Sequence, residues 1–261
     1  MLAWQAHRDY PLILAANRDE FFARPTLQAA PWPESAAVIG GRDLEKGGSW
    51  LALSASGQLA AVTNFRDGTR TKSGSRSRGL LVSDFVLSDL DARQYIEAVR
   101  ASRETYDGFN LILAANGELV HYANVSDELA ALAPGVYGLS NHLLDTPWPK
   151  VRRAKAALQR VLVAPPETLA EALFEALGDT RRAADEELPR TGVSVEWERQ
   201  LASIFISASG YGTRASTVVL AHRSGHLTFI ERSFAPSGMP TETRTLERRL
   251  DSTAPHPWTF A

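Results

Sequence analysis

Cysteine is absent from the 261-residue sequence. This absence excludes disulfide bonds and thiolate metal ligands, and it fits a reducing compartment, so we expect a cytoplasmic location. The sequence also lacks any apolar run near the roughly 18 residues that a membrane-spanning helix needs. Its first ten residues contain neither a basic leader nor a small-residue cleavage site, so we predict that they are not a signal peptide.

An excess of charge of one sign is also missing. The formal net charge is −2 and the isoelectric point is about 6.3, which argues against a nucleic-acid partner or a membrane-surface role. The six histidines are scattered without H-E-x-x-H spacing, so we predict no metal site. Glycine-rich nucleotide motifs and the G-x-S-x-G nucleophile motif are absent as well, and we predict no cofactor.

The most informative stretch that is present is Tyr10–Arg24. An apolar run, Leu12–Ala16, leads directly into the quartet Asn17-Arg18-Asp19-Glu20. Short apolar runs bounded by polar breakers are typical of strands buried on both faces. Such a strand would deliver an amide, a guanidinium and two carboxylates to the rim of a sheet, where rigid scaffolds present chemistry. The competing interpretation is a strand that ends in a solvated turn.

The rest of the chain alternates hairpins with a central block of helices, which predicts a single α+β domain over residues 1–261. The order of elements favours two mostly antiparallel sheets layered with helices. The prolines of AAPWPES exclude a central strand there, and Arg66–Arg78 is predicted to be a mobile basic loop. The last 27 or so residues show no clear periodicity. The expected strands are Leu2–Ala6, Leu12–Ala16, Ala36–Ile39, Ser49–Ser54, Gln58–Phe65, Phe109–Ala114, Glu118–Ala123, Gly135–Leu139, Ser203–Ile206, Arg214–Ala221 and Leu227–Phe234.

Helix signals occupy the middle of the chain. Apolar spacing predicts a helix over Gly79–Ser88, and Ser88-x-x-Asp91 resembles a capping box that opens a second helix. Thr146-Pro147 is predicted to begin a third helix, and Pro166–Leu177 is expected to form a fourth that ends at a glycine.

Further polar residues stand at strand ends in the same way as the quartet, namely Asn64, Asn141 and Arg214. The asparagines have a purely structural alternative, since their side chains can tie off strand ends through hydrogen bonds to backbone. Three serines are candidate nucleophiles only with a histidine base nearby, and His142 next to Ser140 is weak support for one. These serines are Ser49, Ser140 and Ser216.

The segments that contain these residues resemble the NRDE-domain family, also called the transport and Golgi organization family. The resemblance covers the chain from Ala3 to about Phe234. It rests on AANRDEFFARPT, GRDLEKGGSWLAL, AAVTNFRD, SRGLLVSDF, YGLSNHLLDTPWPKV and YGTRASTVVL.

That family is in turn similar to the N-terminal-nucleophile cysteine hydrolases of the choloylglycine hydrolase and penicillin acylase type. The resemblance implies an αββα sandwich and an active site built from Asp19, Asn17, Asn64, Asn141 and Arg214. Asn64 and Asn141 would then be oxyanion donors, and Asp19 would orient the nucleophile and its amine. The arginine of the hydrolase motif is displaced here to position 18. Substrate contacts are expected from Arg18, Glu20, Arg42 and His142.

The nucleophile of that enzyme class has no counterpart in the sequence. If the first hairpin turns near residue 8 or 9, paired positions sum to about 17, and Leu2 lies opposite Ala15. The family's cysteine would fall about two residues before Met1 and is expected opposite Asp19. We therefore expect the N-terminal strand to be shortened by a few residues, and the sequence as it stands to be inactive in thiol chemistry.

Three functions follow as hypotheses. The first is acyl transfer or hydrolysis on a small amide or ester. The second is non-enzymatic handling of a small ligand such as haem, in which the Arg66–Arg78 loop would meet propionates and His142 would reach the iron. The third is a structural or regulatory role for a hydrolase fold that no longer catalyses.

Overall fold

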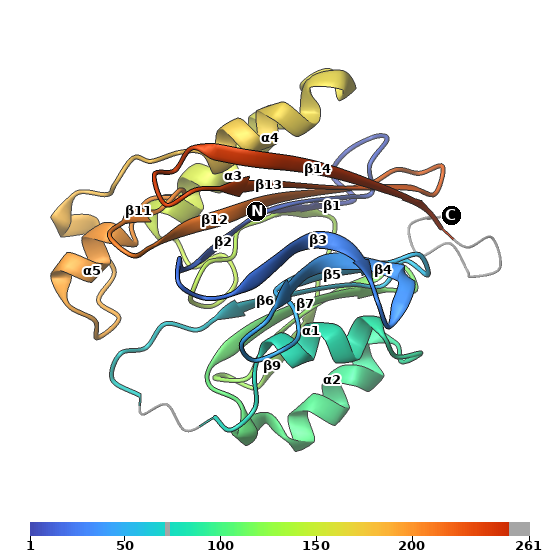
Figure 1. Cartoon of the computed structure of the whole chain (residues 1–261), viewed down its shortest axis with the longest axis horizontal. Helices are drawn as coiled ribbons and strands as arrows, with labels where there is room; N and C mark the ends of the chain where they lie inside the picture. Colours follow the sequence, from blue (N-terminus) through green and yellow to red (C-terminus); the bar gives the residue numbers. More distant parts are fainter. Residues whose placement is uncertain (71–73, 251–261) are drawn as a thin grey trace.

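Two seven-stranded antiparallel sheets face each other, and a pair of helices covers the outer face of each (Figure 1). This computed structural model describes residues 1–70 and 74–250. The layers therefore run helix, sheet, sheet, helix, and three apolar cores lie between them. The predicted sandwich of two mostly antiparallel sheets is confirmed.

The first sheet, sheet A, has the order β10-β1-β2-β12-β13-β14, and the short β11 pairs with β12. Its long central strand β2 is apolar over its first half, and this half is buried between the sheet-to-sheet core and the helices. The strands of sheet A are β1 (Leu2–Trp4), β2 (Leu12–Phe21), β10 (Gly135–Tyr137), β11 (Ser207–Ala208), β12 (Tyr211–Ala221), β13 (His226–Phe234) and β14 (Pro240–Arg249).

The second sheet, sheet B, follows chain order from β3 to β9. Asn116 and Gly117 join β7 to β8 with φ angles of 50° and 78°, the left-handed pair that a two-residue hairpin turn requires. The strands are β3 (Thr26–Trp32), β4 (Ser35–Asp43), β5 (Leu51–Ser54), β6 (Leu59–Asn64), β7 (Phe109–Ala115), β8 (Glu118–Ala123) and β9 (Glu128–Ala131).

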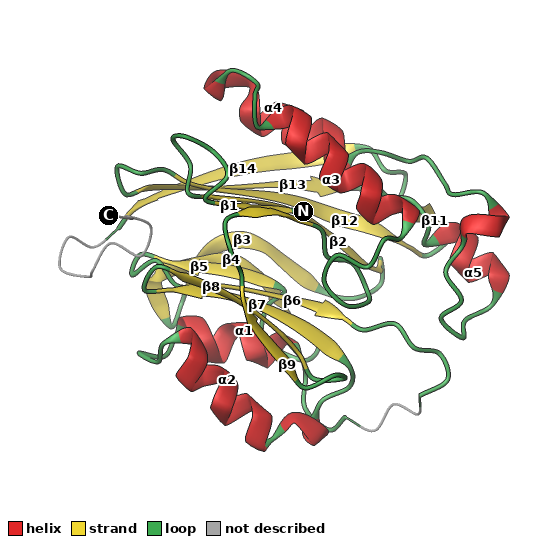
Figure 2. Cartoon of the chain, turned by 180° about the vertical axis from the view of Figure 1, so that it is seen from behind, coloured by secondary structure: helices red, strands yellow, loops and turns green. Residues whose placement is uncertain are grey.

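Helices α1 and α2 pack on sheet B, while α3 and α4 pack on sheet A, as the view from behind shows (Figure 2). The short helix α5 lies beyond the end of sheet A. Three single 3₁₀ turns complete the helical structure of the described residues, at Arg103–Thr105, Pro166–Thr168 and Asp185–Glu187. The α-helices are α1 (Gly79–Val86), α2 (Ala92–Ala101), α3 (Pro149–Val161), α4 (Leu169–Leu177) and α5 (Val195–Gln200).

The helix ends differ from expectation at two places. The capping box of α2 is formed by Asp91 and Gln94, because Asp91 accepts from the Gln94 backbone and Gln94 accepts in return. Helix α3 begins at Pro149, two residues later than predicted, with Trp148 as its extended N-cap. Proline suits the first helical turn in either register, so the sequence alone did not select between Pro147 and Pro149.

The strands differ from expectation mainly at sheet edges. The first four residues of the proline-rich connector, 29–32, end β3, which lies at the edge of sheet B, where a missing N–H is tolerated. Residues 203–206 form no strand. The polar β14, by contrast, is an edge strand within the stretch that showed no clear periodicity, while residues 251–261 lie outside the described part. The first hairpin pairs Leu2 with Leu14, so its register is shifted by one residue from the predicted pairing.

Candidate functional site

A cavity of about 590 Å³ lies beside the second half of β2. The short β1 pairs with β2 only at its beginning, and the backbones of Met1 and Ala15 exchange hydrogen bonds of 2.8 and 2.9 Å where this pairing ends. Beyond Ala15, β2 continues to Phe21 with β12 on its other side, and the described chain places no strand on the β1 side. The cavity therefore opens along a free strand edge.

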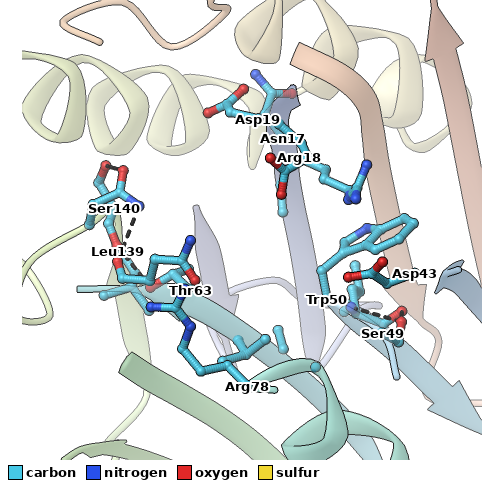
Figure 3. Close-up of a pocket in the computed structure, with 18 of the residues that line it drawn as sticks. Asn17, Arg18, Asp19, Asp43, Ser49, Trp50, Thr63, Arg78, Leu139 and Ser140 are labelled. Carbon is cyan, nitrogen blue, oxygen red and sulfur yellow. Dashed lines mark hydrogen bonds between the residues drawn. The ribbon is translucent and has the colours of Figure 1, made fainter. Parts of the chain in front are cut away.

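The walls of the cavity come from both sheets and from α3 (Figure 3). Sheet A supplies the quartet, and β6 of sheet B supplies Thr63 and Asn64. The segment that follows β10 closes one side, and Lys150, Val151 and Ala154 of α3 close another. Asn17, Arg18, Asp19, Glu20, Asn64 and Asn141 all line the cavity, so six of the nine predicted site residues are brought together.

Asn17 ties β2 to two neighbouring segments. Its Nδ2 donates to the carbonyls of Leu177 and Ile204, each at 3.0 Å, and its Oδ1 accepts a 2.6 Å bond from Ser216. The side-chain amide is thus occupied by protein partners that lie 160 or more positions away. This arrangement matches the structural alternative for a strand-end asparagine, and it leaves Asn17 little capacity to donate to a ligand.

Asp19 and Lys150 are two opposite charges in the cavity wall whose pKa values are both shifted. Asp19 is part-buried and accepts a 2.6 Å hydrogen bond from the Thr213 hydroxyl. Loss of hydration raises the pKa of its carboxyl, against the opposing field of Lys150. Burial likewise lowers the pKa of Lys150 to about 8, and the charge of Asp19 counteracts that shift. Such opposed shifts are typical of functional sites, although buried structural pairs show them too.

Arg18 and Glu20 lie on the opposite face of β2, because side chains alternate along a strand. The Arg18 guanidinium stacks on the Trp50 ring, with 4.3 Å between its central carbon and the ring centroid. Glu20 lies 3.6 Å from Arg24, which also holds Asp43 at 2.6 Å. Of these two guanidinium groups, Arg18 on β2 and Arg24 in the turn after it, only that of Arg24 has acidic partners among the described residues.

The two remaining asparagines meet across the cavity mouth. Asn141 donates its Nδ2 to the backbone carbonyl of Asn64 at 3.1 Å, and Thr63 donates its hydroxyl to the carbonyl of Ser140 at 2.9 Å. These bonds attach the segment after β10 to the end of β6. The side-chain amide of Asn64 is exposed and makes no hydrogen bond with the described residues, so it is the asparagine amide of this site that can still donate.

Arg214 lies outside the cavity lining, contrary to the clustering that we predicted. A β-bulge shifts the register between Thr213 and Ala215, and Arg214 is the extra residue at this bulge. Bulges redirect side chains. Its guanidinium accordingly donates to the carbonyls of Phe21 and Arg24 and braces the turn after β2.

Arg42 also lies away from the cavity. It sits on β4 next to the sheet edge, where its Nη2 bonds Glu34 at 2.9 Å and its guanidinium stacks on Trp32. Its position follows from its partners, both of which belong to the β3–β4 hairpin region. The substrate contact predicted for Arg42 is therefore not supported by its location.

His142 does not line the cavity either. Its Nδ1 lies 2.9 Å from the hydroxyl of Thr146, and its ring packs between Phe65 and Trp148. No histidine lines the cavity within the described residues. Iron ligation by His142 in this cavity is therefore unsupported, and no grouping of three or more potential metal-ligating side chains occurs among residues 1–70 and 74–250.

The candidate serine nucleophiles are all engaged with neighbouring groups. Ser49 donates to Leu51 O, Ser216 donates to Asn17, and Ser140 is 3.4 Å from the Asn141 side chain. Without a histidine base in the described lining, none of them has the partner that an activated serine requires.

The basic segment between β6 and α1 is better anchored than its composition suggests. Arg66 is part-buried, lies 3.1 Å from Glu198 and stacks on Trp148, and Arg78 donates to Gly108 O at 3.0 Å. Both ends of the predicted mobile loop are therefore packed against the protein, while residues 71–73 lie outside the described part.

Sequence reasoning missed two cavity residues, Lys150 and Trp50. Lysine is usually exposed, and nothing local marks Lys150 as buried apart from its place one residue after the helix-opening proline. Trp50 has the composition of a core residue, although it follows a glycine pair of the kind that permits close packing around a site.

Comparison with known proteins extends this description. The sequence profile of the family described as Transport and Golgi organisation 2 matches residues 1–236. The chain belongs to this family. It is 40% identical over 265 residues to the Transport and Golgi organization protein 2 homolog of Bos taurus, covering 93% of this chain and 94% of that protein.

Two further relatives in the Transport and Golgi organisation 2 family are less identical but also match most of the chain. The Homo sapiens homolog is 36% identical over 264 residues, with 93% of this chain and 94% of the relative covered. The Drosophila melanogaster protein is 32% identical over 247 residues, covering 86% of each. The family assignment thus includes every element that lines the cavity. Among the described residues, no helix is sufficiently long and apolar to cross a membrane.

Proposed function

We propose that this protein binds a small molecule in the cavity beside β2. The observation that carries the proposal is the cavity itself, whose volume of about 590 Å³ falls within the roughly 300–1,000 Å³ typical of small-molecule sites. Its lining combines apolar side chains with many polar and charged ones, so it offers both apolar contact and groups that can orient a polar ligand. Asp19, Arg18 and Lys150 supply those groups from two different layers.

The test places a bulky side chain in the cavity by substituting one residue of α3, and the rest of the helix is unchanged. Ala154 lines the cavity, whereas Ala156 on the same helix is exposed and lies outside it. The wild-type protein is incubated with a low-molecular-mass extract of the cells that produce it, and bound molecules are measured by native mass spectrometry. We expect a retained mass in the wild type and in Ala156→Trp, and its loss in Ala154→Trp.

Two outcomes contradict this proposal. One is a wild-type protein that retains nothing from the extract. The other is a retained mass that persists unchanged when Ala154→Trp fills the cavity, because the molecule would then bind elsewhere. Thermal unfolding of both tryptophan variants controls for the integrity of the fold.

A second candidate is acyl transfer of the N-terminal-nucleophile type on a small amide or ester. It is favoured by the αββα layers and by the pairing of Met1 with Ala15 at the cavity. Continuing that register, a residue two positions before Met1 would lie opposite Asn17, and not opposite Asp19 as the sequence predicted. It would share the face of the sheet with Asn17 and Asp19, since directly paired residues project to the same side.

An engineered extension tests this candidate. Adding Met-Cys-Ala before Met1, with removal of the initiator methionine, places the cysteine two positions upstream. Met-Ala-Cys is the matched control, because its cysteine lies opposite Ala16 on the other face. We expect faster alkylation by iodoacetamide and turnover of p-nitrophenyl acetate only with the first extension. Asn64→Ala should then lower turnover by about 10²–10³ without slowing alkylation.

Equal alkylation rates for the two extensions, together with no ester turnover, would remove the enzymatic candidate. The binding proposal would be unaffected, because its experiment uses the chain without any extension.

A further inference from the structure

Arg18 is a buried cation without a protein partner for its charge. The residue is only 9% exposed, yet its guanidinium makes no hydrogen bond or ion pair with any described residue. Its one direct interaction is the stacking contact with Trp50 at 4.3 Å. Burying an ionised group costs considerable free energy unless it is paired, so an unmatched guanidinium in a cavity wall needs an explanation.

None of the acidic groups near Arg18 forms an ion pair with it among the described residues. Asp43 is bound by Arg24 at 2.6 Å, and the same arginine lies 3.6 Å from Glu20. Glu231 is buried on β13, where Oε1 accepts a 2.7 Å hydrogen bond from the backbone of Ala29 and Oε2 has no hydrogen-bond partner among the described residues. These carboxylates act on Arg18 only through space, and burial remains the main influence on the guanidinium, lowering its pKa.

Trp50 holds the guanidinium in a fixed place. A Cβ atom at Gly41 would lie 2.2 Å from the Cη2 atom of the Trp50 ring, so the ring packs directly against the bare backbone of β4. Figure 3 shows Arg18 extending from β2 toward this ring at the cavity wall. Stacking covers one face of the guanidinium, and the N–H donors lie in its plane, where they remain available to a planar acceptor.

We propose that Arg18, positioned by Trp50, binds an anionic group, a carboxylate or a phosphate, of the small molecule that occupies the cavity. This inference rests on the proposed binding function and adds the chemical class of the ligand. Both groups match the donor fork of arginine, which recognises them through paired, charge-assisted hydrogen bonds. The anionic group of the ligand would form the ion pair with Arg18 that none of the described residues forms.

Three probes of equal chain length test the proposal, namely octanoate, octyl phosphate and octanamide. Their affinities are measured by isothermal titration calorimetry, and so is their ability to displace the molecule retained from the extract. We expect the anions to bind about 10- to 100-fold more tightly than the neutral amide, which is the usual range for hydrogen bonds to charged groups. The anion that binds more tightly shows whether the anionic group of the ligand is a carboxylate or a phosphate.

Variants assign the effect to Arg18. Arg18→Gln should lower the affinity for the anions by about tenfold or more and leave octanamide unchanged. Arg18→Lys keeps the charge without the paired donors and should lie in between. Arg42→Gln is the matched control, because Arg42 also stacks on a tryptophan, at 4.4 Å, but it has Glu34 as a partner and lies outside the cavity.

The possible failures are distinguishable. If octanamide binds or competes as well as the anions, or if Arg18→Gln weakens all three probes equally, the anionic ligand is excluded while the binding function stands. The anionic ligand is likewise excluded if neither anion displaces a retained molecule. If the wild-type protein retains nothing from the extract, the proposed function itself fails.

Discussion

The hydroxyl of Thr213 on β12 donates a 2.6 Å hydrogen bond to Oδ1 of Asp19 on β2. The same hydroxyl accepts a 2.9 Å hydrogen bond from the backbone N–H of Ile206. Thr213 therefore connects the cavity carboxylate to the segment that precedes β11. It also lies next to the β2–β12 register shift, so one buried threonine holds Asp19 beside the bulge.

Replacing Thr213 with valine should destabilise the protein. The shape of the side chain is kept, but Asp19 and the N–H of Ile206 each lose a partner in a buried setting. We expect a loss of about 1–3 kcal/mol in the free energy of unfolding, measured in urea. Thr213→Ser keeps the hydroxyl and should recover most of this loss. Equal stability of the valine and serine variants would contradict the role given to this hydroxyl.

Lys150 should contribute a pH-dependent penalty to stability. Its pKa is lowered from 10.5 to about 8 in the folded protein, so the unfolded chain binds its proton more tightly. The penalty is therefore full below pH 8 and disappears as the pH rises from about 8 to 10.5. The lowering corresponds to at most about 3.5 kcal/mol, since one pKa unit is about 1.4 kcal/mol.

The measurement compares Lys150→Met with the wild type in urea at pH 7 and pH 10. The free energy of unfolding of the variant, relative to that of the wild type, should be higher at pH 7 than at pH 10. The absolute gain is reduced because Asp19 loses its opposing charge. Lys155→Met is the control, because Lys155 is a part-exposed lysine on the same helix, paired with Asp145 at 2.7 Å. A difference between variant and wild type that does not change with pH would contradict the prediction.

Truncation to alanine should lower the stability of the protein at Asn17 and leave it almost unchanged at Asn64. Asn17→Ala removes the donor to two backbone carbonyls and the acceptor for Ser216, so we expect a loss of about 2–4 kcal/mol in stability, the sum of two to three unmet bonds. Asn64→Ala removes an exposed amide and should change stability by less than about 0.5 kcal/mol. Thermal and urea unfolding of the two variants provide the comparison. If Asn17→Ala is as stable as the wild type, the structural role of Asn17 is contradicted, and the residue is available for binding or chemistry.

The architecture and six of the nine predicted cavity residues were accessible from the sequence because their signals are local. An apolar run that ends in a polar quartet predicts a buried strand with a functional rim, and Asn116-Gly117 predicts a hairpin. These signals depend on neighbours in the chain. The quartet accordingly lines the cavity, together with Asn64 and Asn141.

The rest of the site depends on contacts between distant segments. The bulge at Arg214 results from the pairing of β2 with β12, which no local pattern of β12 reveals. The burial of Lys150 results from packing of α3 against sheet A, and a lysine in a helical pattern ordinarily indicates a solvated face. The polar edge strand β14 buries little, so its alternation is weak. Tertiary context decided each of these features.

Gly41 should be intolerant of even one added methyl group, because the Trp50 ring occupies the space beside its backbone. In Gly41→Ala the new Cβ would lie 2.2 and 2.3 Å from two ring atoms and 3.1 Å from the carbonyl oxygen of Leu27. Overpacking of this kind typically costs about 1–3 kcal/mol, and here it should also displace the ring that positions Arg18. We therefore expect lower stability in urea, an altered tryptophan emission spectrum and weaker binding of octanoate. Gly178→Ala is the control, since its nearest contacts are at 3.4 Å and its backbone is unstrained. A Gly41→Ala protein that matches this control in all three measurements would show that Trp50 is free to move.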